Sequence, residues 1–364
     1  MSRRVFTSAV LLHVVLMCCS GTATAEVENN ADASNSVSAL TGAITAEGSV
    51  SGGVEKLQRV DLFVPQTTLL QPKDGIVPVT TRHSFVSPSL VSAGGVIAAF
   101  AEGYMNAEYQ CGQLSRPFSS GVVAGCIDSV WNWSTVVGEV NKDTLIAHTV
   151  VCAAEGEESL GVVLRPTTIA KGDKVFLLAG GTALSYVVGN GKEDRFELKL
   201  VVGEVTKSTD GKPSGWIKWG DPKPLPKRIS SASHEGEWTG FFASGGSGIL
   251  MEDGTIVFPL MAMNKENELD VYSMIIYSTD NGSTWSLAVG MSSAKCLNPR
   301  VTEWKESLLM IVDCENDQAV YESRDMGTTW TEAIGKLPGV WVKSQSEDYP
   351  DGVWHVDALM TATI

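Results

Sequence analysis

Two aspartates in the C-terminal half of the chain occur in the same local pattern, S-x-D-x-G-x-T-W, and lie 45 positions apart. Two carboxylates could share general acid and base catalysis if the fold brought them together. Identical copies one repeat apart cannot both occupy one active site, so we interpret Asp280 and Asp325 as turn-building residues. The repeated positions are Ser278, Asp280, Gly282, Thr284 and Trp285 in the first copy, and Ser323, Asp325, Gly327, Thr329 and Trp330 in the second.

Each copy of this turn motif has the composition of a tightly closed hairpin. An Asp at the end of a strand can accept backbone N–H groups, and a Gly two residues later can adopt positive φ. The Thr hydroxyl can bond to the Asp carboxylate, and the Trp ring can bury a large flat surface between layers. Because a 45-residue repeat has the length of one propeller blade, the spacing predicts a β-propeller.

Short apolar or β-branched runs separated by turn signals fill most of the chain after position 57. No long amphipathic helix stands out between them, so we predict an all-β chain. The Pro-rich stretch 221–226 is expected to connect two blades. The clearest strand candidates are residues 96–101, 175–179, 198–205, 248–250, 255–258, 271–277, 308–312 and 319–321.

The composition excludes several classes of function. A formal net charge of −15 over 364 residues repels phosphate backbones, which argues against nucleic-acid binding. No interior apolar run reaches the length of a membrane-spanning helix, and the chain carries no lipid-anchor signal. No C-x-x-C pair or His cluster suggests a metal site, and no cofactor is expected.

The N-terminus predicts secretion. Two arginines precede an apolar stretch over residues 5–17, and an A-x-A cleavage site ends at Ala25. The segment that follows is small and polar, which is typical of a mobile leader. The predicted organisation is a signal peptide over residues 1–25, a low-complexity leader over 26–56 and a propeller over 57–364.

Secretion would make disulfides and glycosylation possible. An odd number of cysteines remains after the cleavage site, so at least one thiol is unpaired or bonded to another chain, and the pairing stays open. Asn132 and Asn281 each begin a tripeptide that fits the N-glycosylation pattern. The remaining cysteines are Cys111, Cys126, Cys152, Cys296 and Cys314.

Several longer stretches, together with the twin motifs, resemble the trypanosome trans-sialidase superfamily of surface glycoproteins. The resemblance implies a sialidase-type six-bladed β-propeller, followed in most members by a lectin-like β-sandwich. Since the chain ends at Ile364, we expect the propeller to be incomplete and the sandwich to be missing. The stretches that carry the resemblance are residues 83–85, 94–102, 202–209, 217–220 and 320–335.

Active members of this superfamily cleave or transfer terminal sialic acid. The resemblance implies an arginine triad on the sugar carboxylate, because a planar guanidinium matches a carboxylate bidentately. It also implies a Tyr nucleophile activated by a Glu, and an Asp as acid/base. A neutral phenol suits this substrate because the anomeric carbon already carries a carboxylate, and sialidases are the Tyr-using exception among glycosidases.

This chain departs from the pattern of active members at most of these positions. Val86 stands where the first triad Arg is expected, and Arg165 replaces an Asp before Pro-Thr. Asn298 replaces the Glu that activates the nucleophile, and Thr182 replaces a Tyr that packs on the substrate. No Arg lies near residues 311–313, the expected place of the second triad Arg. The third Arg and the Tyr nucleophile are expected beyond the end of the chain.

Three charged residues remain candidates for the site. Glu102 aligns with the acid/base Asp and is a weak catalytic candidate, and a surface residue at a strand end is the favoured alternative. Arg165 is a candidate ligand-binding residue that could be a surface cation or could form an ion pair across the pocket. Arg300 is a weak candidate for binding anions and could instead be solvated.

Without nucleophile, base and carboxylate clamp, we expect sialidase and trans-sialidase activity to be absent. The first hypothesis is therefore a non-catalytic secreted or surface glycoprotein that binds sialylated glycans or host surface proteins as an adhesin or antigen. The second is an active sialidase or trans-sialidase. The third is a truncated gene product without a stable function, since an unclosed propeller exposes strand edges.

Overall fold

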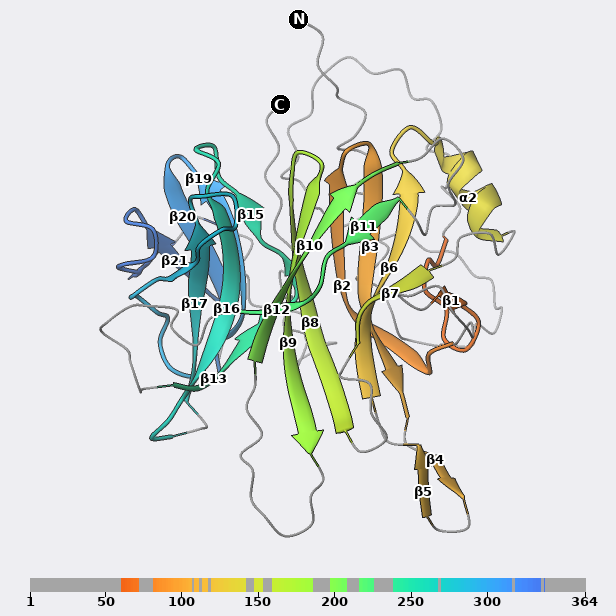
Figure 1. Cartoon of the computed structure of the whole chain (residues 1–364). Helices are drawn as coiled ribbons and strands as arrows, with labels where there is room; N and C mark the ends of the chain where they lie inside the picture. Colours follow the sequence, from red (N-terminus) through yellow and green to blue (C-terminus); the bar gives the residue numbers. More distant parts are fainter. Residues whose placement is uncertain are drawn as a thin grey trace, which may run out of the picture.

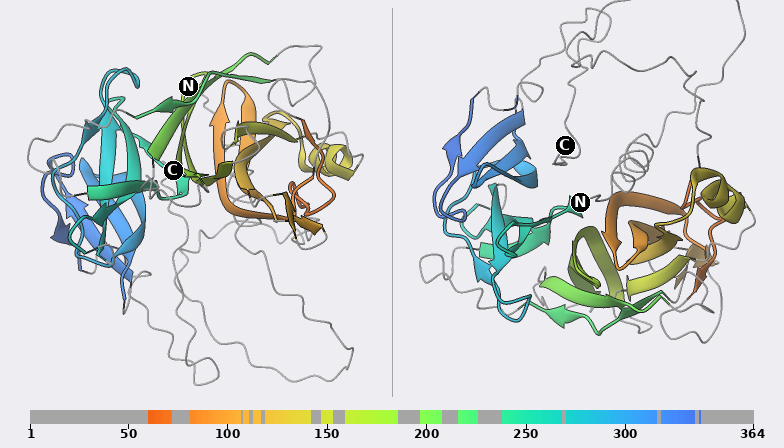
Figure 2. Two further views of the ribbon diagram at one scale, coloured as in Figure 1. Left: turned by 60° about the horizontal axis from the view of Figure 1, so that its bottom comes forward. Right: turned by 90° about the horizontal axis from the view of Figure 1, so that it is seen from above.

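The structure is a computed structural model, and most of the residues it describes lie in β-sheets that follow one another around a common centre (Figure 1, Figure 2). The predicted signal peptide and leader lie outside the described residues, as do residues 338–364. Among the residues described, no helix is both long and apolar enough to cross a membrane. The described residues are 60–71, 81–106, 108–110, 113–116, 119–141, 147–152, 159–185, 197–207, 216–225, 238–267, 270–315, 318–334 and 337.

Sheet 1 has the order β1-β7-β6-β3-β2, and it carries the single helix of the described part, α2 (Trp133–Asn141). A separate hairpin, β4 and β5, extends from it (Figure 1). The strands are β1 (Leu70–Gln71), β2 (Ser84–Ala93), β3 (Val96–Met105), β4 (Glu108–Gln110), β5 (Gln113–Arg116), β6 (Ser119–Asp128) and β7 (Ala147–Cys152).

Sheet 2 has the order β11-β10-β9-β8-β14. Part of the stretch predicted as a connection, 221–226, instead forms β12, which pairs with β10, so that prediction is wrong for these two residues. A free edge of β10 beside β11 accepts this short strand. The strands are β8 (Ser159–Lys171), β9 (Lys174–Ser185), β10 (Glu197–Val205), β11 (Ile217–Trp219), β12 (Lys223–Pro224) and β14 (Gly246–Ser247).

Sheets 3 and 4 contain the two turn motifs. Sheet 3 has the order β13-β16-β17-β18, with β15 paired to β16, and sheet 4 has the order β19-β20-β21-β22. The all-β prediction is confirmed, whereas six blades stay a prediction. The strands are β13 (Trp238–Ala243), β15 (Ile249–Leu250), β16 (Ile256–Asn264), β17 (Val271–Ser278), β18 (Ser286–Leu287), β19 (Leu297–Trp304), β20 (Ser307–Asp313), β21 (Gln318–Ser323) and β22 (Thr331–Glu332).

The hydrophobic core consists of layers between neighbouring sheets rather than one central mass. Strand β20 illustrates the consequence for the sequence. Met310 packs in the layer toward sheet 3, whereas the next residue, Ile311, packs with Val320 and Ala333 on the other face. Because alternate residues of a strand point to opposite faces and both faces are buried here, β20 is an almost continuous apolar run.

The turn motifs lock each sheet onto the one before it. Gly282 has φ +82°, and a Cβ there would lie 2.6 Å from Cε1 of Phe176 in sheet 2. Gly327 has φ +73°, and a Cβ there would lie 2.8 Å from Cδ1 of Ile275 in sheet 3. Each position therefore requires glycine for two reasons: the backbone has positive φ, and a side chain of the preceding sheet lies where a Cβ would be.

Sheets 1, 2 and 4 share an irregularity in the first strand of their central hairpin. Each strand has a register shift, and inside it one residue takes positive φ immediately before a proline: Ser87 (52°), Arg165 (55°) and Asn298 (50°). Between β13 and β15, which both pair with β16 of sheet 3, Gly245 and Gly246 take positive φ. A non-glycine residue in this conformation costs about 1–3 kcal/mol, and a following proline disfavours it further. Such bulges re-aim side chains.

Small buried polar residues join the sheets at the centre. The Ser89 hydroxyl in sheet 1 lies 2.5 Å from the Thr168 hydroxyl in sheet 2 and donates to the Gly246 carbonyl at 2.5 Å. The Thr167 hydroxyl accepts a bond from the Gly245 N–H at 2.9 Å. These contacts hold the three innermost strands at fixed spacing, which positions the bulges relative to one another.

Candidate functional site

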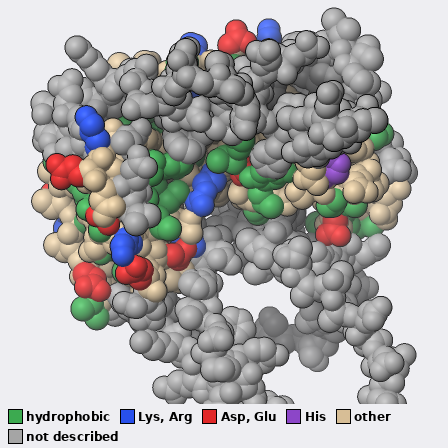
Figure 3. Space-filling model, turned by 90° about the horizontal axis from the view of Figure 1, so that it is seen from below, with side chains coloured by type: hydrophobic (Ala, Val, Ile, Leu, Met, Phe, Trp, Pro, Cys, Tyr) green, Lys and Arg blue, Asp and Glu red, His purple; other side chains and the backbone are tan. Residues whose placement is uncertain are grey.

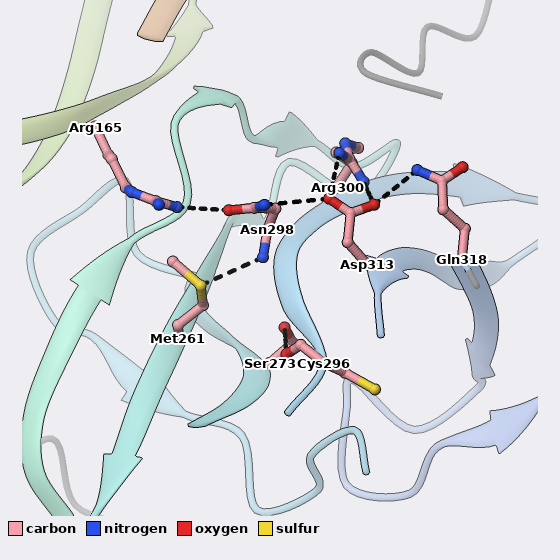
Figure 4. Close-up of polar contacts among 8 residues, drawn as sticks. All are labelled: Arg165, Met261, Ser273, Cys296, Asn298, Arg300, Asp313 and Gln318. Atoms are coloured by element: carbon pink, nitrogen blue, oxygen red, sulfur yellow. Dashed lines mark hydrogen bonds and ion pairs between the residues drawn. The ribbon is translucent and has the colours of Figure 1, made fainter. Parts of the chain in front are cut away.

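A chain of polar contacts crosses the centre of the molecule and joins three sheets, and Figure 4 shows the part of it from Arg165 to Gln318. It begins at Glu102 on β3 of sheet 1 and passes through Arg165 on β8 of sheet 2. It continues to Asn298 on β19 and ends around Asp313 on β20, both in sheet 4. Two of the three positive-φ residues, Arg165 and Asn298, are therefore direct partners.

Arg165 reaches across the centre from sheet 2 to sheet 4. Its Nη1 donates to Oδ1 of Asn298 at 2.6 Å, although the two residues are 133 positions apart in the chain. The side chain passes Gly245, where a Cβ would come within 3.8 Å of the Arg165 Cβ. The sequence left open a surface cation or an ion pair; the guanidinium is partly buried and bonds to a neutral amide instead.

Asn298 also bonds to Asp313, the carboxylate at the centre of a polar cluster in sheet 4. Its Nδ2 donates to Oδ2 of Asp313 at 3.1 Å, and its backbone N–H approaches the Met261 sulfur at 3.3 Å. Arg300 binds Asp313 with two bonds of 2.9 and 2.8 Å, and Gln318 donates to it at 2.7 Å. The Arg300 charge is thus neutralised inside the protein rather than solvated.

The Asp313 carboxyl titrates below its ordinary pKa. Burial alone would raise its pKa, but the bonds from Arg300, Gln318 and Asn298 together with the Arg300 charge outweigh burial and lower it. Asp313 is therefore ionised at neutral pH and holds Arg300 and Asn298 in place. It acts as a structural acceptor and has no proton to donate at that pH.

Glu102 is only 2% exposed, so the interpretation of a surface residue at a strand end is wrong. The reason is its position on β3 between β2 and β6, inside sheet 1. Its Oε2 accepts the Arg165 backbone N–H at 2.9 Å, and its Oε1 accepts the Tyr104 hydroxyl. Burial, followed by the bond to Glu102 and its charge, raises the pKa of Tyr104, so the phenol stays protonated.

The other positions expected to carry catalytic groups do not restore them. Val86 is 44% exposed and pairs with Glu102 across β2 and β3, which leaves an apolar side chain beside that carboxylate. Ile311 is fully buried in an apolar layer. Thr182 lies in β9, but its side chain falls outside the described part of the structure.

Three members of the cluster were missed by the sequence analysis: Tyr104, Asp313 and Gln318. Tyr104 had a local signal, because it lies two positions after Glu102 on one strand and so shares its face. Asp313 and Gln318 carried no such signal. Their roles depend on Arg300 and Asn298 lying on the neighbouring strand β19.

The two repeated aspartates lie in different sheets and bond within their own turns. Asp280 Oδ1 accepts from the Ser278 hydroxyl and the Thr284 N–H, both at 2.8 Å, and Oδ2 accepts from the Thr284 hydroxyl at 2.7 Å. The backbone bond from Thr284 is the main cause that lowers the Asp280 pKa to about 2. Asp325 makes the equivalent bonds to Ser323 and Thr329.

A disulfide lies beside the polar cluster. Cys296 and Cys314 are bonded, and they stand two positions before Asn298 and one after Asp313. Cys126 is a free buried thiol, and burial raises its pKa to about 12. The Cys111 and Cys152 side chains lie outside the described residues.

The two candidate glycosylation residues occupy different local structures. Asn132 is exposed and caps α2, since its Oδ1 accepts the Thr135 N–H at 2.9 Å and the Ser134 hydroxyl at 2.7 Å. Asn281 is exposed within the first turn motif and has φ 59°. Both side chains are therefore accessible.

Comparisons with known proteins agree with this fold. The model of the BNR repeat-like domain matches residues 87–362. Sialidase 85-1.1 of Trypanosoma cruzi is 61% identical over 365 aligned residues, which cover 100% of this chain and 48% of that protein. A Clostridium perfringens sialidase is 36% identical over 118 residues, 31% of each chain.

Solved structures give the same assignment. Trypanosoma rangeli sialidase matches with a TM-score of 0.62 at 28% identity, over 77% of this chain and 43% of that one. The same sialidase in complex with sialic acid matches with a TM-score of 0.61. The chain spans about half or less of the length of these relatives. From its sequence and its sheets, the chain belongs to the trans-sialidase superfamily and carries a BNR repeat-like domain of the sialidase type.

Proposed function

We propose that this chain is a carbohydrate-binding member of the superfamily that neither hydrolyses nor transfers sialic acid. We further propose that it is secreted or displayed at the cell surface, where it binds sialylated glycans as an adhesin or antigen. Support for the ligand class comes from a relative, because Trypanosoma rangeli sialidase forms a complex with sialic acid.

The observation that carries the loss of catalysis is the bond between Arg165 and Asn298. Asn298 stands where the resemblance places a general base, but its amide has no titratable proton and both of its polar ends are bonded. Glu102 is held in one orientation by the bonds that its two oxygens accept from the Tyr104 hydroxyl and the Arg165 backbone N–H. A general base must instead be within reach of the proton that it removes and be free to accept it.

The absence of the base and of the first arginine that the resemblance implies is expected to lower kcat strongly. Removing a single charge-stabilising donor commonly lowers kcat by about 100- to 1,000-fold. Here a base position holds Asn298, and an apolar Val86 stands where the first arginine is expected. Because such groups act together, the remaining members of a site cannot restore the rate.

A direct assay tests the proposal. Purified chain is incubated with a fluorogenic sialoside and with a sialyl donor plus a lactose acceptor, and Trypanosoma rangeli sialidase serves as the active control. We expect no release and no transfer above the blank, together with measurable binding to a sialylated glycan surface. Turnover that disappears in Glu102→Gln would overturn the proposal, since it would assign catalysis to this chain.

A further inference from the structure

Two residues with strained backbone at the centre of the molecule point their side chains toward each other. Arg165 and Asn298 both adopt positive φ before a proline, and their side chains meet at 2.6 Å (Figure 4). Such strain persists only where the surroundings enforce it, and it is concentrated at functional sites. Neither residue is needed for the apolar layers, since neither belongs to a core cluster.

Arg165 is the cation of this cluster whose charge is not matched by a carboxylate. Arg300 is paired with Asp313, whereas Arg165 donates through Nη1 to a neutral amide and makes no ion pair in the described part of the chain. Its guanidinium carries five N–H donors in a planar fork, and the side chain is partly exposed. Figure 3 shows a Lys or Arg side chain beside apolar ones near the middle of one face.

We propose that Arg165 forms a single-arginine subsite for the carboxylate of an acidic sugar, and that Asn298 holds it in a binding-ready orientation. This proposal rests on the proposed function, because it names the group that selects the glycan. Among the described residues, the amide of Asn298 occupies one N–H of the guanidinium, and the other N–H groups are left for a ligand. A carboxylate then receives two parallel bonds from the guanidinium.

The residues around Arg165 favour a ligand with one negative charge over a ligand with several. Glu102 and Asp313 flank Arg165 and Asn298, and the whole chain carries a net charge of −15, so a phosphate dianion or a polyanion would be repelled. Apolar side chains lie next to the same residues. Val86 pairs with Glu102 and is 44% exposed, and Leu297 precedes Asn298 and is 39% exposed, so the proposal assigns both of them contacts with the C–H faces of a sugar ring. A monocarboxylate sugar satisfies both features.

Asn298 is a positioning residue in this proposal. Its Nδ2 is fixed by Asp313, which is itself held by Arg300 and Gln318. This order fixes the amide with its oxygen toward Arg165. A carboxylate at position 298 would pair with Arg165 and compete with the ligand, although the shape of the side chain would hardly change.

Titration calorimetry with N-acetylneuraminic acid and with its methyl ester tests the subsite, because the two differ in the carboxylate alone. We expect the wild-type chain to bind the acid and to bind the ester about tenfold more weakly. Arg165→Gln and the nearly isosteric Asn298→Asp should each weaken binding of the acid about tenfold. Arg324→Gln, which removes the same charge from an exposed turn, should stay within about twofold.

The outcomes separate the two proposals. Equal binding of acid and ester, or unchanged binding by both Arg165→Gln and Asn298→Asp, overturns the subsite and leaves glycan binding intact. Absence of binding to any sialylated or neutral glycan at millimolar concentration overturns both. A thermal melt of each variant verifies folding, and Asn298→Asp keeps the test decisive if Arg165→Gln fails to fold.

Discussion

At the scale of single residues, the polar groups at the centre of this molecule are bonded to one another. Glu102 is held by Tyr104 and by the Arg165 backbone, and Asp313 is held by Arg300 and Gln318. Polar groups in such a network rigidify the protein when all are satisfied and destabilise it when one is removed. Two predictions follow from individual side chains.

Asp313→Asn should destabilise the chain by about 2 kcal/mol, because it leaves the Arg300 charge largely buried without its carboxylate. The value is lower than for a fully buried pair, since the Asp313 side chain is 21% exposed. Urea denaturation measures the loss. Glu315→Gln, which breaks an exposed pair with Lys295, is the control and should cost below about 1 kcal/mol. Equal losses for both variants would contradict the prediction.

His148 should make stability fall in mild acid. It is buried, accepts a bond from the Trp219 indole at 2.8 Å, and burial lowers its pKa from 6.5 to about 4. As pH falls from about 6.5 to 4, His148 therefore becomes protonated in the unfolded chain but stays neutral in the folded chain. This linkage removes about 3 kcal/mol of stability over that window and none of it above pH 7.

Denaturation curves at several pH values test this linkage. His148→Gln keeps an acceptor for Trp219 but does not titrate, so its stability should decline less steeply between pH 6.5 and 4. Other groups titrate in both proteins and cancel in the comparison. Parallel pH profiles for the two proteins would show that His148 is not responsible.

At the scale of elements, the twin turn motifs connect sheets as well as close hairpins. Gly282 of sheet 3 fits against Phe176 of sheet 2, and Gly327 of sheet 4 fits against Ile275 of sheet 3. The Asp, Ser and Thr side chains fix the shape of each turn, and the glycine lets the turn approach the preceding sheet. A repeat of this kind therefore sets the packing between sheets.

Gly282→Ala should destabilise the chain by about 2–3 kcal/mol, since it combines a positive φ with a Cβ placed 2.6 Å from Phe176. Gly172→Ala separates the two causes. Gly172 also has positive φ (+64°), but nothing lies within 4 Å of its Cβ position, so about 1 kcal/mol is expected. Thermal or urea unfolding measures both, and equal losses would exclude the packing contribution.

At the scale of the whole molecule, the sheets depend on a few polar contacts at their centre. Ser89 joins sheet 1 to two strands of sheet 2, β8 and β14, through its bonds to Thr168 and Gly246. The bond between Arg165 and Asn298 spans from sheet 2 to sheet 4. These contacts join elements that are distant in sequence, so they affect the arrangement of the sheets more than any one hairpin.

Ser89→Ala should cost about 1–3 kcal/mol, because it leaves the Thr168 hydroxyl and the Gly246 carbonyl without this partner in a buried place. It should also broaden the unfolding transition, since sheet 1 loses two of its contacts with sheet 2. Calorimetry and fluorescence of the tryptophans measure both effects. Ser283→Ala, on an exposed turn, is the control and should leave the width of the transition unchanged.

Local features of this protein could be derived from its amino-acid order alone. The repeated turns, the strand positions and the all-β class follow from patterns within about ten residues, because side-chain alternation and turn conformations are local properties. The family assignment follows from the same stretches, and the comparisons confirm it.

Only the tertiary structure decided what the charged residues do. The burial of Glu102, the pairing of Arg300 with Asp313 and the bond between Arg165 and Asn298 join side chains whose approach depends on bulges and on sheet packing. A residue type and its neighbours in sequence do not specify those distances. They arise when the sheets pack around their centre and bring distant strands within hydrogen-bonding range.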